Sequence, residues 1–117
     1  MSTLQFQHLT IVRLLTPAVM PPDSHQDREI QVAHIRYLSG LRSQGIVLLN
    51  GPVTKIDDPR FRGLTIYSVA PDEARGYAME DPAVKAGWFE VEVNGWRLPS
   101  IPTTLGDRVD SEIEVDW

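Results

Sequence analysis

Cysteine is absent from this chain of 117 residues. Its absence excludes disulfide bonds, thiolate metal sites and a cysteine nucleophile. Histidine is scarce as well, because only His8, His25 and His34 occur and their spacing matches no compact metal-binding motif. We therefore predict no metal and no cofactor. A site built from carboxylates alone stays open, but Asp57 and Asp58 most simply form a solvated turn.

Basic residues and long apolar runs are also in short supply. The 11 lysines and arginines are outnumbered by 16 acidic residues, which gives a net charge of -5. This balance argues against the clustered basic face that nucleic-acid binding requires. The apolar run at residues 46–49 is far shorter than the roughly 20 residues that cross a bilayer, and no signal region opens the chain. We expect a cytoplasmic protein with neither nucleic-acid nor membrane partners.

The hydrophobic pattern predicts strands and helices in alternation. Strands are indicated by continuous or period-two apolar stretches, and helices by apolar residues three and four positions apart. Gly45 is a natural end for the first helix, and Pro82 can begin one further helical turn at residues 82–86. The predicted strands cover residues 6–15, 46–49, 64–69 and 88–94, and the two main helices cover residues 27–44 and a segment beginning at Pro71.

The order of these elements is strand, helix, strand, strand, helix, strand. It predicts an α+β protein with a ferredoxin-like antiparallel sheet and two helices on one face. The other face needs a cover, because Trp88 and Trp96 would expose large apolar surfaces on a solvated sheet. A second subunit packed sheet to sheet would provide it, so we predict a homodimer.

The composition changes after residue 98, where three turn-forming residues precede an acidic end: Pro99, Pro102 and Gly106. We divide the chain into a ferredoxin-like domain at residues 1–98 and an acidic extension at residues 99–117. Ile113, Val115 and Trp117 alternate with acidic residues in the extension. It is therefore either an edge strand, including one that wraps around a partner subunit, or a frayed end.

Two blocks of sequence carry a family resemblance. Residues 33–38, which include His34, lead to residues 48–52, where a predicted strand ends in Gly51-Pro52. Residues 79–91 contain Asp81-Pro82 and then Ala-Gly and Glu-Val pairs. In this order and spacing, most of the stretch from about residue 5 to residue 97 resembles the YCII-related (YciI-like) family.

The resemblance implies an assembly and a site. The assembly is a dimeric α/β barrel, and the site is a catalytic dyad in which His34 pairs with Asp81. The resemblance also implies that Gly51 and Pro52 shape the pocket that receives the substrate. The extension at residues 99–117 lies beyond the family pattern.

The residues themselves leave two interpretations open. His34 lies between Ile30 and Leu38 on the apolar side of its helix, where the ring needs a polar partner but could be purely structural. Asp81 precedes Pro82 and could serve only as a helix N-cap. If Asp81 instead accepts a hydrogen bond from the ring, it fixes the tautomer and leaves the second nitrogen to remove a substrate proton.

The preferred hypothesis is a cofactor-independent enzyme of the lyase, isomerase or dehydrohalogenase type. Its substrate would be a small aromatic or ring-derived metabolite, with His34 as the base and Asp81 as its orienting partner. The resemblance motivates this activity, because relatives include dehydrochlorinating enzymes. The alternatives are a non-catalytic module that binds a small molecule or another enzyme, and a purely structural dimer.

Overall fold

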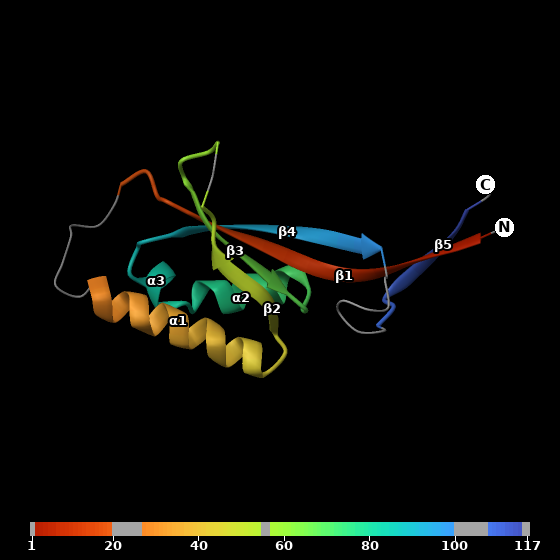
Figure 1. Cartoon of the computed structure of the whole chain (residues 1–117), viewed down its shortest axis with the longest axis horizontal. Coiled ribbons are helices and arrows are strands. Elements are labelled where there is room, and N and C mark those ends of the chain that lie inside the picture. The colour runs from red at the N-terminus through yellow and green to blue at the C-terminus, as the bar shows by residue number, and fades with distance from the viewer. Residues whose placement is uncertain (1, 20–26, 55–56, 100–107, 116–117) are drawn as a thin grey trace.

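The computed structural model describes residues 2–19, 27–54, 57–99 and 108–115. Within these ranges the chain forms five strands and three helices (Figure 1). In chain order they are β1 (Ser2–Leu15), α1 (Asp27–Ser43), β2 (Val47–Pro52), β3 (Phe61–Tyr67), α2 (Pro71–Met79), α3 (Pro82–Lys85), β4 (Glu90–Pro99) and β5 (Ser111–Val115).

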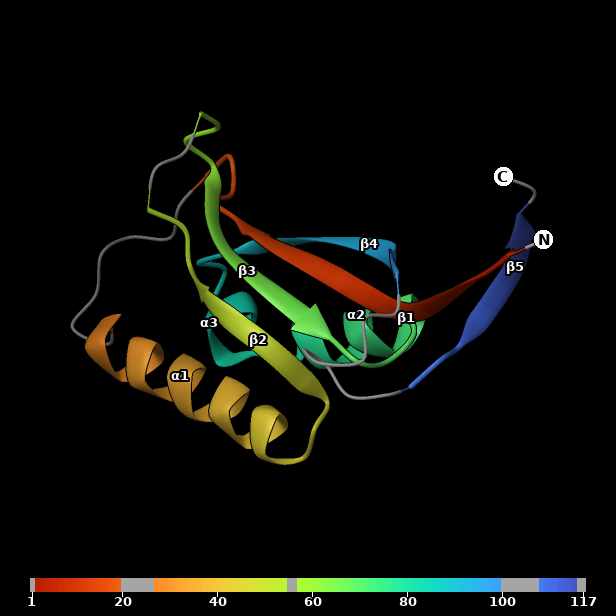
Figure 2. The ribbon, with the colours of Figure 1, turned by 45° about the vertical axis from the view of Figure 1, so that its right-hand side comes forward.

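Four of the strands form an antiparallel sheet in the order β2-β3-β1-β4. The central strand β1 pairs with β3 along one edge and with β4 along the other. All three helices lie on one face of this sheet (Figures 1 and 2). The predicted ferredoxin-like α+β fold is therefore confirmed. The opposite face of the sheet carries none of the described helices.

The core fills the layer between the sheet and the helices. Val12 and Leu14 lie on the covered face of β1, and α1 contributes Leu38 and Leu41. The fully buried side chains of α2 are small alanines, and Tyr77 of the same helix packs against the core while partly buried. The buried residues of this cluster are Val12, Leu14, Leu38, Leu41, Val47, Tyr67, Ala74 and Ala78.

The ends of α1 and α3 follow the local signals in the sequence. Gly45, two residues after the end of α1, adopts a φ of 76°, a left-handed conformation that glycine accepts readily. The short helix α3 begins at Pro82, as predicted. Trp88 still belongs to the turn that closes α3, because its backbone N–H donates to the Ala83 carbonyl at 3.0 Å.

Several strand boundaries differ from the predicted ones. β4 starts at Glu90 and runs to Pro99, two residues later and five residues further than predicted. β1 begins at Ser2, and its pairing with β4 and β5 explains the extra length. β2 continues through Gly51 to Pro52, and the edge position of β2 tolerates a residue without a backbone N–H.

The acidic extension contains β5, which pairs with the first residues of β1 in the same chain. Leu4 lies opposite Ile113, and Phe6 lies opposite Ser111. The two strands project beyond the helices and carry both termini to one end of the molecule (Figures 1 and 2). Three residues of the predicted extension lie outside the described residues. They are Trp117 of the alternating apolar and acidic pattern, and Pro102 and Gly106 of the turn-forming segment before it.

Truncation of a core leucine on α1 should destabilise the protein far more than truncation of an exposed neighbour. Leu38 is 4% exposed, whereas Ile35 is 53% exposed. We expect Leu38→Ala to lower the free energy of unfolding by about 2–5 kcal/mol, because it removes buried methyl groups and leaves a cavity. Ile35→Ala should cost less than about 1 kcal/mol. Urea denaturation of both variants checks this, and equal losses would contradict the assigned core.

Candidate active site

Asp81 occupies the junction between α2 and α3 and caps the shorter helix. Its backbone is extended, and its Oδ1 accepts a hydrogen bond from the Ala83 backbone N–H at 2.9 Å. Pro82 occupies the first turn, where its missing N–H costs nothing. The capping interpretation of Asp81 is therefore correct as far as Oδ1 is concerned. The second carboxylate oxygen is left for another donor.

His34 of α1 supplies that donor. Its Nδ1 lies 2.7 Å from Asp81 Oδ2, and the Asp81 side chain is 3% exposed. An ionised carboxylate only accepts hydrogen bonds, so the proton of this contact resides on Nδ1. Nε2 then carries the lone pair of the neutral ring. Within the described residues Nε2 has no hydrogen-bond partner, and the His34 side chain is 14% exposed.

Aromatic residues surround this pair. The ring of Phe89 lies 5.9 Å from the His34 ring, centroid to centroid, at an interplanar angle of 51°. Tyr37 donates its hydroxyl to the Tyr77 carbonyl at 2.7 Å, which joins α1 to α2. Burial, followed by the negative charges of Asp81 and Glu80, raises the pKa of Tyr37. Its phenol therefore stays protonated near neutral pH and cannot act as a base there.

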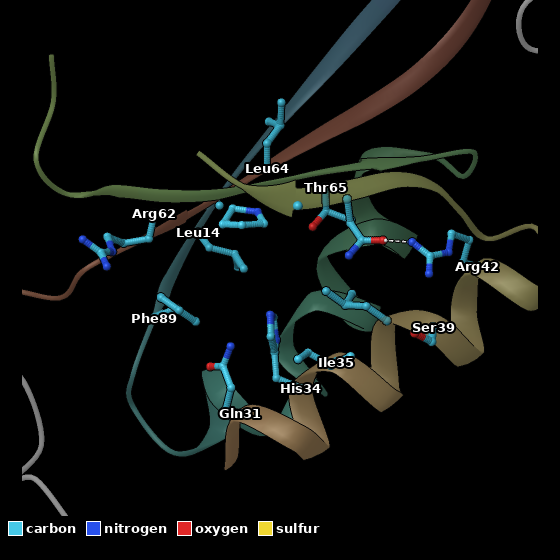
Figure 3. Close-up of a pocket in the computed structure, with 15 residues that line it drawn as sticks. Leu14, Gln31, His34, Ile35, Ser39, Arg42, Arg62, Leu64, Thr65 and Phe89 are labelled. Carbon is cyan, nitrogen blue, oxygen red and sulfur yellow. Dashed lines mark hydrogen bonds between the residues drawn. The ribbon is translucent and has the colours of Figure 1, made fainter. Parts of the chain in front are cut away.

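A cleft of about 390 Å³ opens between α1 and the strands β2 and β3. The His34 ring projects from α1 toward it (Figure 3). Asp81 is not among the lining residues, so the carboxylate lies behind the imidazole. The lining residues are Leu14, Gln31, His34, Ile35, Leu38, Ser39, Arg42, Asn50, Gly51, Pro52, Arg62, Gly63, Leu64, Thr65 and Phe89.

Three of the four site residues named from the sequence therefore border the cleft: His34, Gly51 and Pro52. Gly51 and Pro52 form the end of β2, on the wall that faces α1. Sequence reasoning missed Arg42, Arg62 and Phe89. Only Arg42 carried a usable signal, because it lies two helical turns after His34 and so shares its side of α1.

The remaining histidines and the acidic turn lie elsewhere. His8 Nε2 contacts Ser111 Oγ at 2.6 Å, beside β5, and His25 falls outside the described residues. Asp58 pairs with Arg13 at 3.1 Å and accepts a hydrogen bond from the Arg60 backbone N–H.

Among the described residues no group of three or more histidine and acidic side chains could hold a metal ion. None of the helices described is long and apolar enough to span a bilayer.

The fold and this sequence define a known class of protein. The family model of the YCII-related domain matches residues 11–97. The chain therefore belongs to the YCII-related family, as the resemblance indicated.

One similar solved structure is 5-chloro-2-hydroxyhydroquinone dehydrochlorinase (TftG) from Burkholderia phenoliruptrix AC1100, in complex with 2,5-dihydroxybenzoquinone. It shares 28% sequence identity with this chain, with a TM-score of 0.53. The match covers 75% of this chain and 92% of the other. No curated protein sequence matches the chain.

Replacing Asp81 by asparagine should reverse the tautomer of His34 and leave the helix cap in place. The Ala83 N–H requires an oxygen at the capping position, and asparagine caps about as well as aspartate. Its amide nitrogen then faces Nδ1, which must become the acceptor while Nε2 takes the proton. Two-dimensional ¹⁵N NMR of the imidazole distinguishes the two tautomers. A His34 ring already protonated at Nε2 in the unsubstituted protein would contradict the assigned contact, and the His8 signals serve as the internal control.

Proposed function

We propose that the protein is a cofactor-independent acid–base enzyme that acts on a small ring-derived molecule. The proposed reaction type is that of a dehydrohalogenase, lyase or isomerase, with His34 as general base and Asp81 as its orienting partner. One observation supports this more than any other. One nitrogen of the imidazole is hydrogen-bonded to a buried carboxylate, and the rest of the ring borders a cleft.

In the proposed step, Nε2 of neutral His34 removes a proton from a hydroxyl group or carbon of the substrate. The electron pair of the broken bond forms a new π bond in the substrate. In a dehydrohalogenation the halide then leaves with its own bonding pair, so the net loss is one hydrogen halide. The protonated imidazole later returns its proton to solvent. No oxidant or reductant is needed.

Asp81 would contribute in two ways. Its hydrogen bond to Nδ1 holds the ring in the tautomer that presents a basic Nε2, and its negative charge stabilises the imidazolium that forms. Both carboxylate oxygens are engaged, one by His34 and the other by the Ala83 N–H. The side chain therefore cannot rotate without losing a hydrogen bond in a buried setting.

The comparisons support the reaction type. A dehydrochlorinase at 28% identity, crystallised with a quinone, shares the fold over most of its length. The cleft volume of about 390 Å³ is near the lower end of the range for small-molecule sites and suits a single substituted ring. Phe89 beside the His34 ring offers an aromatic surface against which such a ring can pack.

Removal of the His34 imidazole should abolish most of the turnover. With chlorinated hydroxyhydroquinones as the first substrates, chloride release measures the rate. We expect His34→Ala to lower kcat/KM by about 10²- to 10⁴-fold, the usual contribution of a positioned base. His8→Ala is the matched control, because that histidine lies outside the cleft, and it should retain the full rate. A His34→Ala variant with full turnover would refute the catalytic assignment.

A thermal-shift screen of the same compounds separates catalysis from binding. Stabilisation by a ligand in the unsubstituted protein, without turnover of any compound, would favour the non-catalytic module. Stabilisation that accompanies turnover supports the enzyme. The screen can be run before any substrate has been identified.

We propose in addition that two copies of the chain pack through the face of the sheet that carries no helix. Cross-strand partners share a face, and Ile11 lies opposite Ile66, which in turn lies opposite Leu49. These residues lie on the face opposite that of Val12 and Tyr67. Leu49 is 55% exposed. A second sheet stacked about 10 Å away would cover these apolar side chains.

A charge on this face should prevent dimer formation. We expect the unsubstituted protein to have twice the mass of the chain in light scattering coupled to gel filtration. Leu49→Glu should shift it toward the monomer, because a buried carboxylate without a partner is costly. Val32→Glu, a comparable change at an exposed position of α1 outside the cleft lining, is the control and should leave the mass unchanged. A monomeric unsubstituted protein at high concentration would refute the dimer.

A further inference from the structure

The charged side chains of the described residues that border the cleft are all of one sign. Among the described residues that line it, the ionisable side chains are His34, Arg42 and Arg62, and none is an aspartate or glutamate. The chain as a whole carries a net charge of -5. A cleft with only basic side chains in an acidic protein creates a local positive potential, and such a potential attracts anions.

Neither arginine is paired with a carboxylate of the described residues. In the described part of the chain, Arg13, Arg60 and Arg108 each form an ion pair with a carboxylate. Arg42 and Arg62 form none there. A guanidinium keeps its charge at any physiological pH, so both arginines present a full positive charge to the cleft.

The two arginines come from different elements. Arg42 lies in the last turn of α1, and its Nη1 donates to Asn50 Oδ1 of β2 at 3.0 Å. This bond uses one of five donors and anchors the guanidinium on the cleft wall. Arg62 belongs to β3 and is exposed. Figure 3 shows the two arginines toward opposite ends of the cleft, with His34 between them.

Apolar side chains fill much of the remaining surface. Leu14 and Leu38 border the cleft together with Phe89. A fully hydrated inorganic anion would find few hydrogen-bond donors against these groups. A ring fits them better, because its faces can contact leucine and phenylalanine while a charged substituent reaches an arginine.

We propose that the cleft selects small ring compounds that carry a negative charge, as a carboxylate or an acidic ring hydroxyl. Arg42 and Arg62 are the specificity-determining residues: one pairs directly with this charge, and the other adds to the positive potential of the cleft. The inference rests on the proposed function, because it names the substrate class of the same cleft. A preference for anions also agrees with the proposed proton transfer. Proton removal by His34 leaves additional negative charge on the ligand, which a guanidinium stabilises more strongly as the charge grows.

Salicylate and salicylamide are the probes that test this selection. They have the same ring and differ in one substituent, which is anionic in salicylate and neutral in salicylamide. We expect isothermal titration calorimetry to show at least tenfold tighter binding of salicylate, since a hydrogen bond between two charged groups is stronger than one with a neutral partner. A rise in ionic strength should weaken salicylate binding and leave salicylamide binding unchanged.

Three arginine variants show which residues produce the preference for salicylate. Arg62→Gln and Arg42→Gln should each lower the affinity for salicylate, by about tenfold or more for the arginine that pairs with the carboxylate, and hardly change that for salicylamide. Arg36→Gln is the matched control, because this arginine is exposed on α1 outside the cleft lining and the change in net charge is the same. It should leave both affinities unchanged.

The outcomes separate this inference from the proposed function. A His34→Gln variant that keeps the preference for salicylate supports the anion site whether or not any substrate is turned over. Selective salicylate binding without turnover of any of the chlorinated compounds would favour the non-catalytic module and leave the anion site standing. Equal affinity for the two probes, no binding of salicylate at millimolar concentration, or an equal loss in Arg36→Gln would each overturn the anion site.

Discussion

The Asp81 carboxylate is the constraint on which the site depends. It is buried, and an ionised group without partners would be very costly in that position. Both of its oxygens are occupied, one by the backbone N–H that opens α3 and the other by the His34 ring of α1. The same side chain thus begins one helix, joins it to another and sets the orientation of the imidazole. Capping and orientation are not competing roles for Asp81, because each role uses a different oxygen.

Most of the fold could be predicted because its local signals agree. Apolar periodicity marked the strands and helices, and Gly45 and Pro82 marked the end of α1 and the start of α3. The boundaries of β4 could not be predicted in the same way. Trp88 continues the alternating pattern, yet its backbone N–H bonds to Ala83 of α3. The length of a strand is decided by the partner strand, which lies far away in the sequence.

The candidate site could be predicted only in part, because it too brings together residues that lie far apart in the sequence. His34 and Asp81 were found because each lies in a short block that resembles the family, although 47 positions separate them. Arg62 lies before the predicted third strand, which begins at residue 64, whereas the structure starts β3 at Phe61. Nothing local to Arg62 or Phe89 shows that either borders the same cleft as His34. Such neighbours appear only once β3 and β4 are placed in the sheet.

The arrangement of charges around His34 fits the proposed proton transfer. The transfer creates two charges at once, a positive one on the imidazole and a negative one on the ligand. The buried carboxylate lies behind the ring, and the arginines border the cleft in front of it. Each new charge therefore has its own counter-charge, already in place before the reaction begins. A carboxylate in the cleft itself would oppose an anionic ligand. With Asp81 behind the ring, the base can be supported without repelling the substrate.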